Sequence, residues 1–497
     1  MDFSLLFQNN FKMFLPEFFL ATSILVITLH GSLVATSKVL GFPLLLKSFN
    51  KMSILILGFT LILVNNNSAS FLIVYSSSFI FDLLTLNVKQ FVLFSAILCL
   101  FISEQPLRFG QINQFEYFIL ILCSILGLLF LTSSFDLLSL YLAIEMQSLC
   151  FYVLAAAKKD SSFSTEAGLK YFIIGSFSSG LLLLGISFLY GCTGTTHFDN
   201  FSLLFSEINS SYSFSTSLIE KALLCIIIAF FFKIAAAPFH MWSPDVYEGS
   251  PISSTIFFAI LPKIVLFSTF LRLFQTCFSY FSETLLFFSI CSALCSVIVG
   301  SFVALKQKKL KRLLAYSSIS HVGYLLLAFS CNSLEGTQSL FFYLIIYMLT
   351  SFAIWSVVLS LNTSRNLDKS KTLIDLASLS SVNPLLAFTA LIAFFSLAGV
   401  PPLAGFFAKL EIFVNCLGSS LFFASLIAIL SSVISSFYYI RLIKTIYFEK
   451  VIDNGFKFSV SRSCSLILCF SMFFLFFLFF NPSLLFLQTH KMALCLF

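Results

Sequence analysis

Long apolar stretches, separated by short polar turns, recur from one end of the chain to the other. A helix needs about 20 apolar residues to cross roughly 30 Å of hydrocarbon. Fourteen stretches approach this length, and they predict helices at 14–34, 43–64, 83–103, 115–133, 136–157, 167–190, 220–241, 252–274, 284–305, 313–331, 337–361, 384–409, 418–441 and 464–487. Between the second and third helices, residues 65–82 are apolar enough to hold an additional re-entrant piece. The pattern therefore predicts an all-α, polytopic membrane protein.

The composition agrees with a membrane protein and excludes a soluble one. Hydrophobic residues make up 59% of the chain and charged residues 10%, and the mean hydropathy is +1.02. Phenylalanine accounts for 68 of the 497 residues, which indicates T-rich codons and hence an AT-rich organellar genome. The first 35 residues lack the pattern of a transit peptide, and their apolar stretch is too long for a cleaved signal. Synthesis inside an organelle fits both observations.

Basic residues are distributed unequally between the predicted loops. The loops after helices 1, 5, 9, 11 and 13 hold most of the Lys and Arg, whereas the loops 191–219 and 331–336 hold essentially none. By the positive-inside rule the odd-numbered loops face the side of synthesis, so both termini lie on the other side. The net charge of +7 reflects this topology and not a nucleic-acid site. The loop 242–251 departs from the pattern, because its charged residues are Asp245 and Glu248, which are expected to cap or pair locally.

Ionisable residues interrupt the apolar stretches at four places, namely Glu145, Lys233, Lys263 and Lys409. A charged side chain at the centre of a bilayer costs roughly 2.5–3.5 kcal/mol on insertion scales, so it persists where it is paired, solvated or functional. These four residues are therefore the candidate functional groups. Lys89 and Lys170 lie nearer to helix ends and are expected to extend to the interface. Glu17 is expected in the first turn of a helix, where a carboxylate is favourable.

Two of the predicted helices are expected to be interrupted by proline. The helix at 220–241 contains Pro238, and the helix at 384–409 contains Pro401 and Pro402. Proline lacks a backbone donor and clashes with the preceding turn. In lipid, such a break is tolerated where it is buried in protein or lines a wet cavity. A kink that serves packing alone is the alternative.

The two breaks occupy corresponding positions along the chain. Each lies in the fourth helix of a set of five, and paired broken helices indicate inverted repeats with an ion site at mid-membrane. An odd number of spans places the second set upside down relative to the first. The predicted regions are three N-terminal helices at 1–112, a first repeat at 113–280, a second repeat at 281–445 and a last helix at 446–497.

The charged residues suggest how protons could move. Burial weakens the hold of a lysine on its proton, and a carboxylate at about 4 Å restores about 4 kcal/mol at an effective dielectric of about 20. Moving or neutralising one Glu would therefore switch a lysine between holding and releasing a proton. Lys263 follows Pro262, which opens the backbone locally. The hypothesis is a lateral row joined by water, running through Glu145, Lys233, Lys263 and Lys409.

Other polar residues within the helices have weaker signals. His321 lies in the helix that matches the helix of Glu145, and it is either a relay or a hydrogen-bonded core residue. Four serines of the thirteenth helix either line a water path or, as we favour, bond to carbonyls of their own helix; these are Ser431, Ser432, Ser435 and Ser436. The 13 cysteines form no CxxC motif and are expected to be small buried hydrophobes.

These residues lie in stretches that resemble the subunit 2 family of respiratory NADH:ubiquinone oxidoreductase, complex I. The stretches are YLAIEMQSL, STEAGLKYFIIGSFSSG, FKIAAAPFHMWSPDVYEGSP, LPKIVLF, KRLLAYSSISHVGYLLLA and GVPPLAGFFAKLEIF. They extend over about residues 14–445, and the similarity is closest at 136–272. The HMWSPDVYEGSP string is the most specific, because sister antiporter-like subunits differ there.

The resemblance implies an antiporter-like proton channel in the membrane arm, with proton-pathway residues Glu145, Lys233, Lys263 and Lys409. It implies no cofactor in this chain, with NADH, FMN, iron–sulfur clusters and ubiquinone bound by partner subunits. The implied partners are other antiporter-like and small membrane subunits and the lipid bilayer. The implied location is the mitochondrial inner membrane, with both termini in the intermembrane space.

Three other functions share some of these features. A free-standing cation/proton antiporter component has the same broken helices and lysines, and the DVYEG stretch argues against it. A plastid NADH dehydrogenase-like homologue differs around FHMW and STEAGLKYF. A membrane scaffold would not need the four intact ionisable residues.

Overall fold

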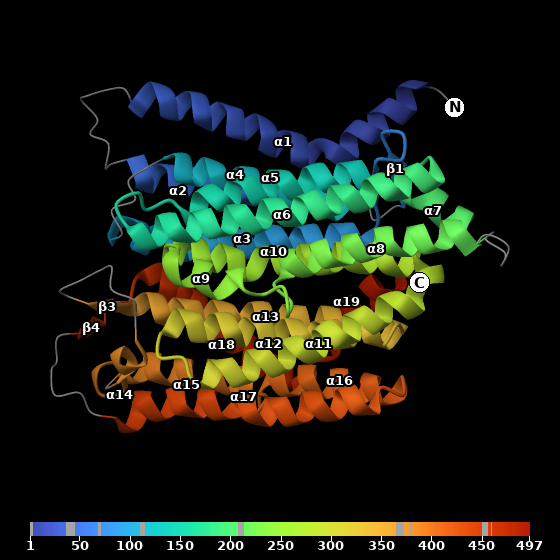
Figure 1. The fold of residues 1–497 in the computed structure, drawn as a ribbon. Coiled ribbons are helices and arrows are strands. Elements are labelled where there is room, and N and C mark those ends of the chain that lie inside the picture. Colours follow the sequence, from blue (N-terminus) through green and yellow to red (C-terminus); the bar gives the residue numbers. More distant parts are fainter. Residues whose placement is uncertain are drawn as a thin grey trace. The chain divides into compact units, whose positions relative to one another are not determined.

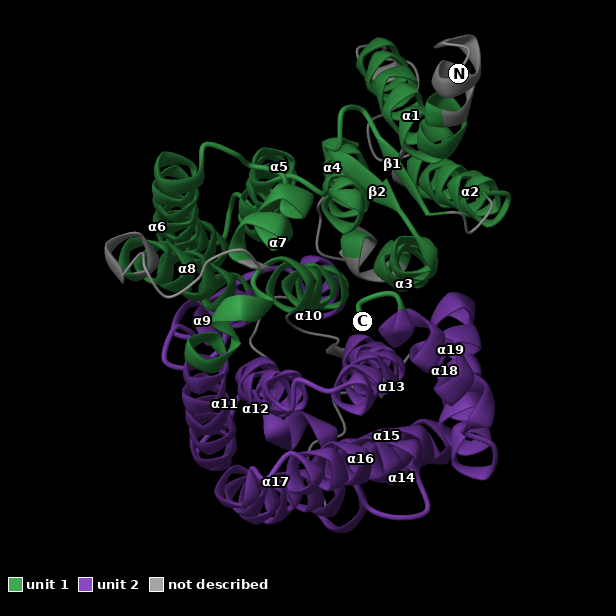
Figure 2. Ribbon diagram, turned by 90° about the vertical axis from the view of Figure 1, so that its right-hand side faces the viewer, with its two compact units in different colours: residues 1–233, 261–285, 495–497 green, residues 234–260, 286–494 purple. Residues whose placement is uncertain are grey.

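A computed structural model describes residues 3–35, 45–67, 71–109, 115–206, 213–363, 372–377, 379–449, 456–458 and 460–497. The described chain is almost entirely helical (Figure 1). It divides into two compact units: unit 1 comprises residues 1–233, 261–285 and 495–497, and unit 2 comprises residues 234–260 and 286–494 (Figure 2).

Unit 1 is built around α4, which contacts α1, α2, α3 and α5. Its elements are α1 (Phe3–Ala35), α2 (Leu45–Asn65), β1 (Leu72–Val74), β2 (Phe79–Phe81), α3 (Leu83–Phe109), α4 (Glu116–Ser133), α5 (Leu137–Ala155), α6 (Ser162–Thr193), α7 (Phe198–Ser206), α8 (Ser213–Ile234), the end of α10 (Ile252–Leu271), the π-helix η2 (Arg272–Cys277) and the 3₁₀ helix η3 (Ser279–Phe281).

Unit 2 is built around α13, which is buried along nearly its whole length and contacts α12, α15, α16, α18 and α19. Its elements are α9 (Trp242–Gly249), the start of α10, α11 (Ser282–Leu305), α12 (Leu310–Ser330), α13 (Leu334–Ser360), β3 (Leu361–Thr363), η4 (Leu373–Leu376), α14 (Leu379–Val382), α15 (Pro384–Ala398), α16 (Ala404–Gly418), α17 (Phe422–Phe448), β4 (Phe456–Phe458), α18 (Arg462–Phe480) and α19 (Ser483–Leu494).

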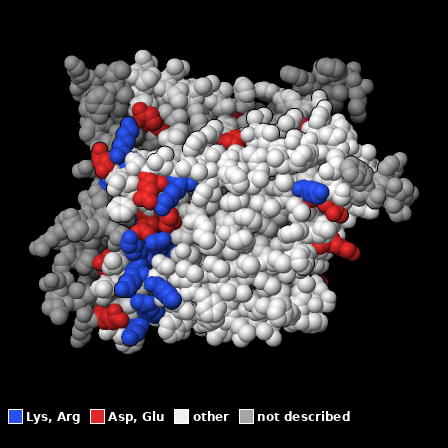
Figure 3. All heavy atoms as spheres, viewed as in Figure 1, with Lys and Arg blue, Asp and Glu red and all other residues white. Residues whose placement is uncertain are grey.

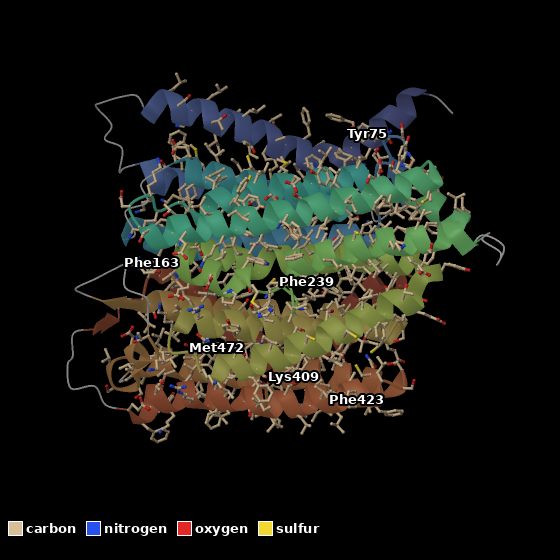
Figure 4. All side chains as sticks on the ribbon, in the orientation of Figure 1. Tyr75, Phe163, Phe239, Lys409, Phe423 and Met472 are labelled. Carbon is tan, nitrogen blue, oxygen red and sulfur yellow. The ribbon has the colours of Figure 1, made fainter. Side chains whose placement is uncertain are left out.

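Twelve of the fourteen predicted spans are confirmed. Twelve helices among the described residues are long and apolar enough to cross a membrane. The helix α8 and the interrupted pair α15–α16 occupy the two remaining predicted spans. Large apolar side chains point outward along these helices, as lipid contact requires. Phe163 and Phe423, labelled in Figure 4, are 67% and 73% exposed. In Figure 3, Lys and Arg gather toward one end of the helices and leave a broad uncharged zone beside them.

Both predicted interruptions are present. The first break separates α8, which ends at Ile234, from α9, which begins at Trp242. The second separates α15, which ends at Ala398, from α16, which begins at Ala404. Each lies in the fourth span of its predicted set of five. The repeat boundaries at 113–280 and 281–445 stay predictions.

The stretch after α2, which was expected to hold an additional re-entrant piece, contains a β-hairpin of β1 paired with β2. Two expected helix ends were wrong. The helix α16 continues to Gly418, beyond the predicted end at 409. The last predicted helix ends at Phe480, because Pro482 follows, and α19 is a separate helix. The hydrophobic pattern identifies apolar runs, but it does not show at which residue the hydrogen bonds of a helix end.

Candidate functional site

Glu145, Tyr152 and Lys233 form one cluster in unit 1. Glu145 and Tyr152 lie seven residues apart on α5, and so two turns apart on one face. The Lys233 ammonium, in the last turn of α8, donates to Tyr152 Oη at 3.4 Å. Its Nζ lies 6.0 Å from the centroid of the tyrosine ring. The Glu145 carboxylate interacts electrostatically with both Tyr152 and Lys233. The structure therefore brings together the two predicted residues through a tyrosine that the sequence analysis missed.

The position of Tyr152 is set by the packing of α6 against α5. The rings of Tyr171 and Phe172 meet the Tyr152 ring edge-on, with centroids 4.9 and 5.7 Å away. A Cβ atom at Gly175 would lie 2.0 Å from Tyr152 Oη, so α6 approaches this hydroxyl more closely than any side chain allows. Tyr152 is thereby held where the Lys233 ammonium can reach it.

Glu145 has capacity for a further hydrogen bond. Its Oε1 atom is buried and has no hydrogen-bond partner among the described residues. A buried carboxylate oxygen without a partner is costly, so a water molecule is expected there. This oxygen can therefore hold one end of a water chain.

The break after Lys233 leaves the C-terminal carbonyls of α8 without intrahelical donors. Ala235 has a left-handed backbone with φ of +64°, a conformation that costs an alanine about 1–2 kcal/mol. The C-terminal end of a helix carries partial negative charge, which favours a nearby cation. Lys233 in the last turn of α8 is in that position.

Lys263 lies on α10 directly after Pro262, and it is 5% exposed. Proline cannot donate to the carbonyl four residues earlier, which here belongs to Phe258. Tyr247 of α9 supplies the missing donor, because its hydroxyl donates to Phe258 O at 3.4 Å. The backbone opening beside Lys263 is thus satisfied by a side chain from the first broken helix.

Lys409 lies on α16, shortly after the second break, within unit 2 (Figure 4). It is 6% exposed. Its ammonium donates to Ala398 O at 2.8 Å, and its Nζ lies 5.5 Å from the centroid of the Tyr324 ring. Ala398 is the last residue of α15, so this carbonyl was freed by the break. The side chain lies against Gly399, whose φ of +82° closes the helix. The C-terminal dipole of α15 therefore holds the cation.

His321 is buried between three helices of unit 2. Its Nδ1 is 2.6 Å from Tyr343 Oη on α13, and its Nε2 is 3.1 Å from Tyr439 Oη on α17. In the neutral ring one nitrogen donates and the other accepts, whereas the protonated ring donates from both. The hydrogen-bonded core position is confirmed, and a relay role stays a prediction.

A small cavity in unit 2 lies between His321 and Lys409. Its volume is about 10 Å³ for water-sized occupants, which is about the minimum for one water molecule. Its polar lining consists of His321, Tyr343, Tyr347, Thr350, Ser396 and Lys409. One water molecule in this cavity would lie beside hydrogen-bonding groups of both His321 and Lys409, the two predicted residues.

Asp245 lies in the first turn of α9, where a carboxylate is favourable, and both Asp245 and Glu248 form ion pairs with residues outside their own loop. Arg312 Nη2 donates to Asp245 Oδ1 at 3.0 Å, and Lys309 pairs with Glu248. Lys311 donates to Ser250 O at 2.6 Å, at the C-terminal end of α9. Both carboxylates therefore anchor α9 to the start of α12. Sequence separation concealed this, because the partners are more than 60 residues away.

The N-terminal helices contain buried charges that were misassigned. Glu17 lies well inside α1, and Lys89, on α3, is 1% exposed. The two side chains form an ion pair. Close by, Arg272 Nη2 donates to Asp82 Oδ2 at 2.6 Å. Lys89 therefore does not extend to the interface, since a buried carboxylate compensates it. Lys170 behaves as expected: its side chain is 42% exposed and pairs with Glu166.

The remaining polar groups gave mixed outcomes. The four serines of α17 donate to carbonyls three residues back, as favoured. The expectation that the cysteines are buried was wrong in part, because Cys291 and Cys295 are exposed on α11.

Comparisons with known proteins agree with this geometry. A family model described as NADH:quinone oxidoreductase/Mrp antiporter matches residues 134–435. The NADH-ubiquinone oxidoreductase chain 2 of Marchantia polymorpha is 43% identical over 99% of this chain and 100% of that protein. A chain of respiratory complex I from Thermus thermophilus, solved with bound aureothin, has a TM-score of 0.78 at 27% identity. That match covers 95% of this chain and 98% of the other.

A chain of the Mrp complex from Dietzia sp. is similar in fold. Its TM-score is 0.80 at 17% identity, over 97% of both chains. Identity at this level shows a shared fold and carries no statement about activity.

Proposed function

This chain belongs to the NADH:quinone oxidoreductase/Mrp antiporter family of membrane proteins, and on that premise we propose that it is the subunit 2 component of an NADH:ubiquinone oxidoreductase. As part of that enzyme it moves protons across the membrane, while quinone is reduced elsewhere in the complex. Its neighbours are the other antiporter-like and small membrane subunits of the membrane arm. The chain binds no cofactor itself; NADH, FMN, iron–sulfur clusters and ubiquinone belong to partner subunits.

The location follows from the same proposal. The chain crosses the mitochondrial inner membrane many times, and both termini face the intermembrane space. The unequal distribution of basic loops supports this orientation.

The observation that carries the proton-transfer function is the presence of a lysine ammonium group at each broken helix, half-buried at Lys233 and buried at Lys409. Lys233 precedes the first break and donates to a hydroxyl beside Glu145. Lys409 follows the second break and donates to a freed backbone carbonyl. Each lysine thus has a partner that stabilises the charged form, together with a nearby group that can bind water or exchange a proton.

In the first cluster, the protonation of Glu145 controls Lys233. While the Glu145 carboxylate is charged, it stabilises the ammonium through the low-dielectric interior. When Glu145 takes up a proton or moves away, that stabilisation is lost, and Lys233 gives its proton to the next acceptor. Lys263, at the backbone opening after Pro262, is the next station of the proposed row.

In the second cluster, the partner of Lys409 is a carbonyl and does not titrate. Release of its proton therefore depends on water entering the adjoining cavity and on His321, which is hydrogen-bonded to Tyr343 and Tyr439. The row Glu145, Lys233, Lys263 and Lys409 ends here.

The test is the pair of variants Lys233→Ala and Lys263→Ala in the intact complex, in sealed membrane vesicles. Each is expected to cut NADH-driven proton transport by at least about tenfold, while native electrophoresis with an NADH activity stain shows an assembled complex. Lys170→Ala is the matched control, because that lysine is exposed at the surface. Normal pumping in both buried variants would refute the proposed role. Migration of the chain away from the NADH activity would instead favour a separate antiporter.

A further inference from the structure

The segment 308–312, which includes the first turn of α12, contacts α9 of the first broken helix and the start of η4, the 3₁₀ helix that precedes the second broken helix in the chain. Toward the first of them, its residues Lys309 and Arg312 form ion pairs with Glu248 and Asp245 of α9. Arg312 Nε also lies 3.4 Å from Glu248 Oε2. One short basic segment thus holds both carboxylates of α9.

The same segment holds the C-terminal end of α9. Lys311 Nζ lies 2.6 Å from Ser250 O and 3.4 Å from Glu248 O. The last carbonyls of a helix lack intrahelical donors, and a cation placed there is favourable. Lys311 supplies both the donor and the charge.

Toward the second broken helix, the contacts are made by the backbone. Leu373 N donates to Lys308 O at 3.0 Å, and Lys309 forms a β-bridge with Thr372. These two partners begin η4, which is closed by the capping box of Thr372 and Asp375. After η4 the chain enters α14 and then α15, whose last carbonyl holds Lys409.

Helix α9 is in turn connected to the environment of Lys263. Tyr247 donates to Phe258 O, the carbonyl that Pro262 leaves without a donor. Asp245, Tyr247 and Glu248 all belong to the DVYEG stretch of α9. Any shift of α9 therefore moves the group that satisfies the opening beside Lys263.

We propose that Lys309 and Arg312 are positioning residues for proton transfer, because they hold α9 in place while the backbone of the same segment holds the start of η4, from which the chain continues through α14 into the second broken helix. This inference rests on the proposed function. The positions of the two breaks then both depend on one short segment, residues 308–312. A displacement at either is transmitted to the other through 308–312. Neither residue touches the proton row itself.

The test compares Lys309→Met and Lys309→Arg in the intact complex in sealed vesicles. Lys309→Met removes the charge that pairs with Glu248, whereas Lys309→Arg keeps it. Misplacement of reacting groups by 1 Å costs on the order of 100-fold. For the smaller displacement of an anchored half-helix we expect Lys309→Met to slow proton transport about tenfold per assembled complex. Lys309→Arg is expected to restore transport to within about twofold of the unmodified chain.

Two further measurements separate positioning from simple stability. Lys306 is exposed on the same loop, and Lys306→Met should leave transport unchanged. The pH profile of transport should shift in Lys309→Met, because displaced helices change the surroundings of the buried lysines. A reduced amount of complex with an unchanged rate and pH profile per complex would overturn the proposal. So would equal rates for Lys309→Met and Lys306→Met.

The outcomes also separate this inference from the proposed function. If Lys233→Ala pumps normally, the proposed function fails. If Lys233→Ala stops transport while Lys309→Met leaves its rate and pH profile unchanged, only the positioning role fails.

Discussion

The two broken helices hold their lysines in opposite ways. At the first break, Lys233 precedes the interruption and donates to the hydroxyl of Tyr152, beside the carboxylate of Glu145. At the second, Lys409 follows the interruption and donates to the backbone carbonyl of Ala398. The first lysine therefore has a partner that can change its charge, and the second is held by a fixed dipole.

This difference indicates where control of proton movement resides. A carboxylate that gains or loses a proton changes the local potential by several kcal/mol, whereas a helix end contributes a constant and smaller term. In the proposed function, the first break is therefore the one that a change of charge can switch. The second depends on its cavity and on His321, which has exchangeable hydrogen bonds on both ring nitrogens.

Removing the titratable group should have the largest effect on this contrast. Glu145→Gln keeps the shape of the side chain but removes its charge. It removes the charge of the carboxylate that acts on Lys233, and loss of a positioned acid–base group costs about 100- to 10,000-fold in rate. We expect NADH-driven proton uptake by vesicles to fall at least about 100-fold. Glu166→Gln, at an exposed carboxylate on α6, is the control and should pump normally. Pumping at the control rate in Glu145→Gln would show that the first break is not switched by charge.

Removing the intermediate hydroxyl should have a smaller effect at the first break. Tyr152→Phe deletes the acceptor of the Lys233 ammonium, and a hydrogen bond to a charged group is worth about 1.5–3 kcal/mol. Proton transport is expected to fall about 10- to 100-fold. Tyr280→Phe, at a tyrosine that is 53% exposed, should leave transport unchanged. If both variants pump alike, Glu145 acts on Lys233 without Tyr152.

Perturbing the fixed dipole should have the smallest effect, and it should appear in stability. Gly399→Ala forces a side chain into the left-handed region at a cost of about 1–2 kcal/mol. Its Cβ would also lie 2.9 Å from Lys409 Cδ. The assembled complex should lose NADH-driven pumping at a lower temperature in a thermal inactivation series. Gly418→Ala on α16 is the control, because nothing lies within 4 Å of its new Cβ. Identical inactivation temperatures would mean that α15 does not need this cap to hold Lys409.

Much of the fold was predictable, because hydrocarbon thickness imposes a one-dimensional constraint on the chain. A span requires a certain length of apolar residues, and each proline removes a backbone donor wherever it occurs. Both features can be recognised in the sequence without knowing which residues pack against the span. The β-hairpin after α2 was missed for the converse reason: strand pairing between Leu72 and Phe81 depends on a partner, and a short apolar run does not specify one.

The candidate residues could also be predicted from the sequence, but their partners could not. A lysine within an apolar run signals a buried charge, but its compensation lies on another helix. Tyr152 is 81 residues from Lys233. Its spacing of seven from Glu145 was an available signal, since both fall on one helix face. For Tyr439, which is 118 residues from His321, no local signal existed.

The sequence by itself determined the spans, the two interruptions and the ionisable groups within them, since each follows from the local cost of placing polar groups in hydrocarbon. Only the tertiary structure decided which atoms satisfy those groups. It joined Lys233 to Tyr152, Lys409 to Ala398, Glu17 to Lys89 and α9 to the start of α12. The physical reason is that a buried charge needs a compensating partner within a few ångströms. Helix packing supplies that partner by bringing together residues that the chain keeps far apart.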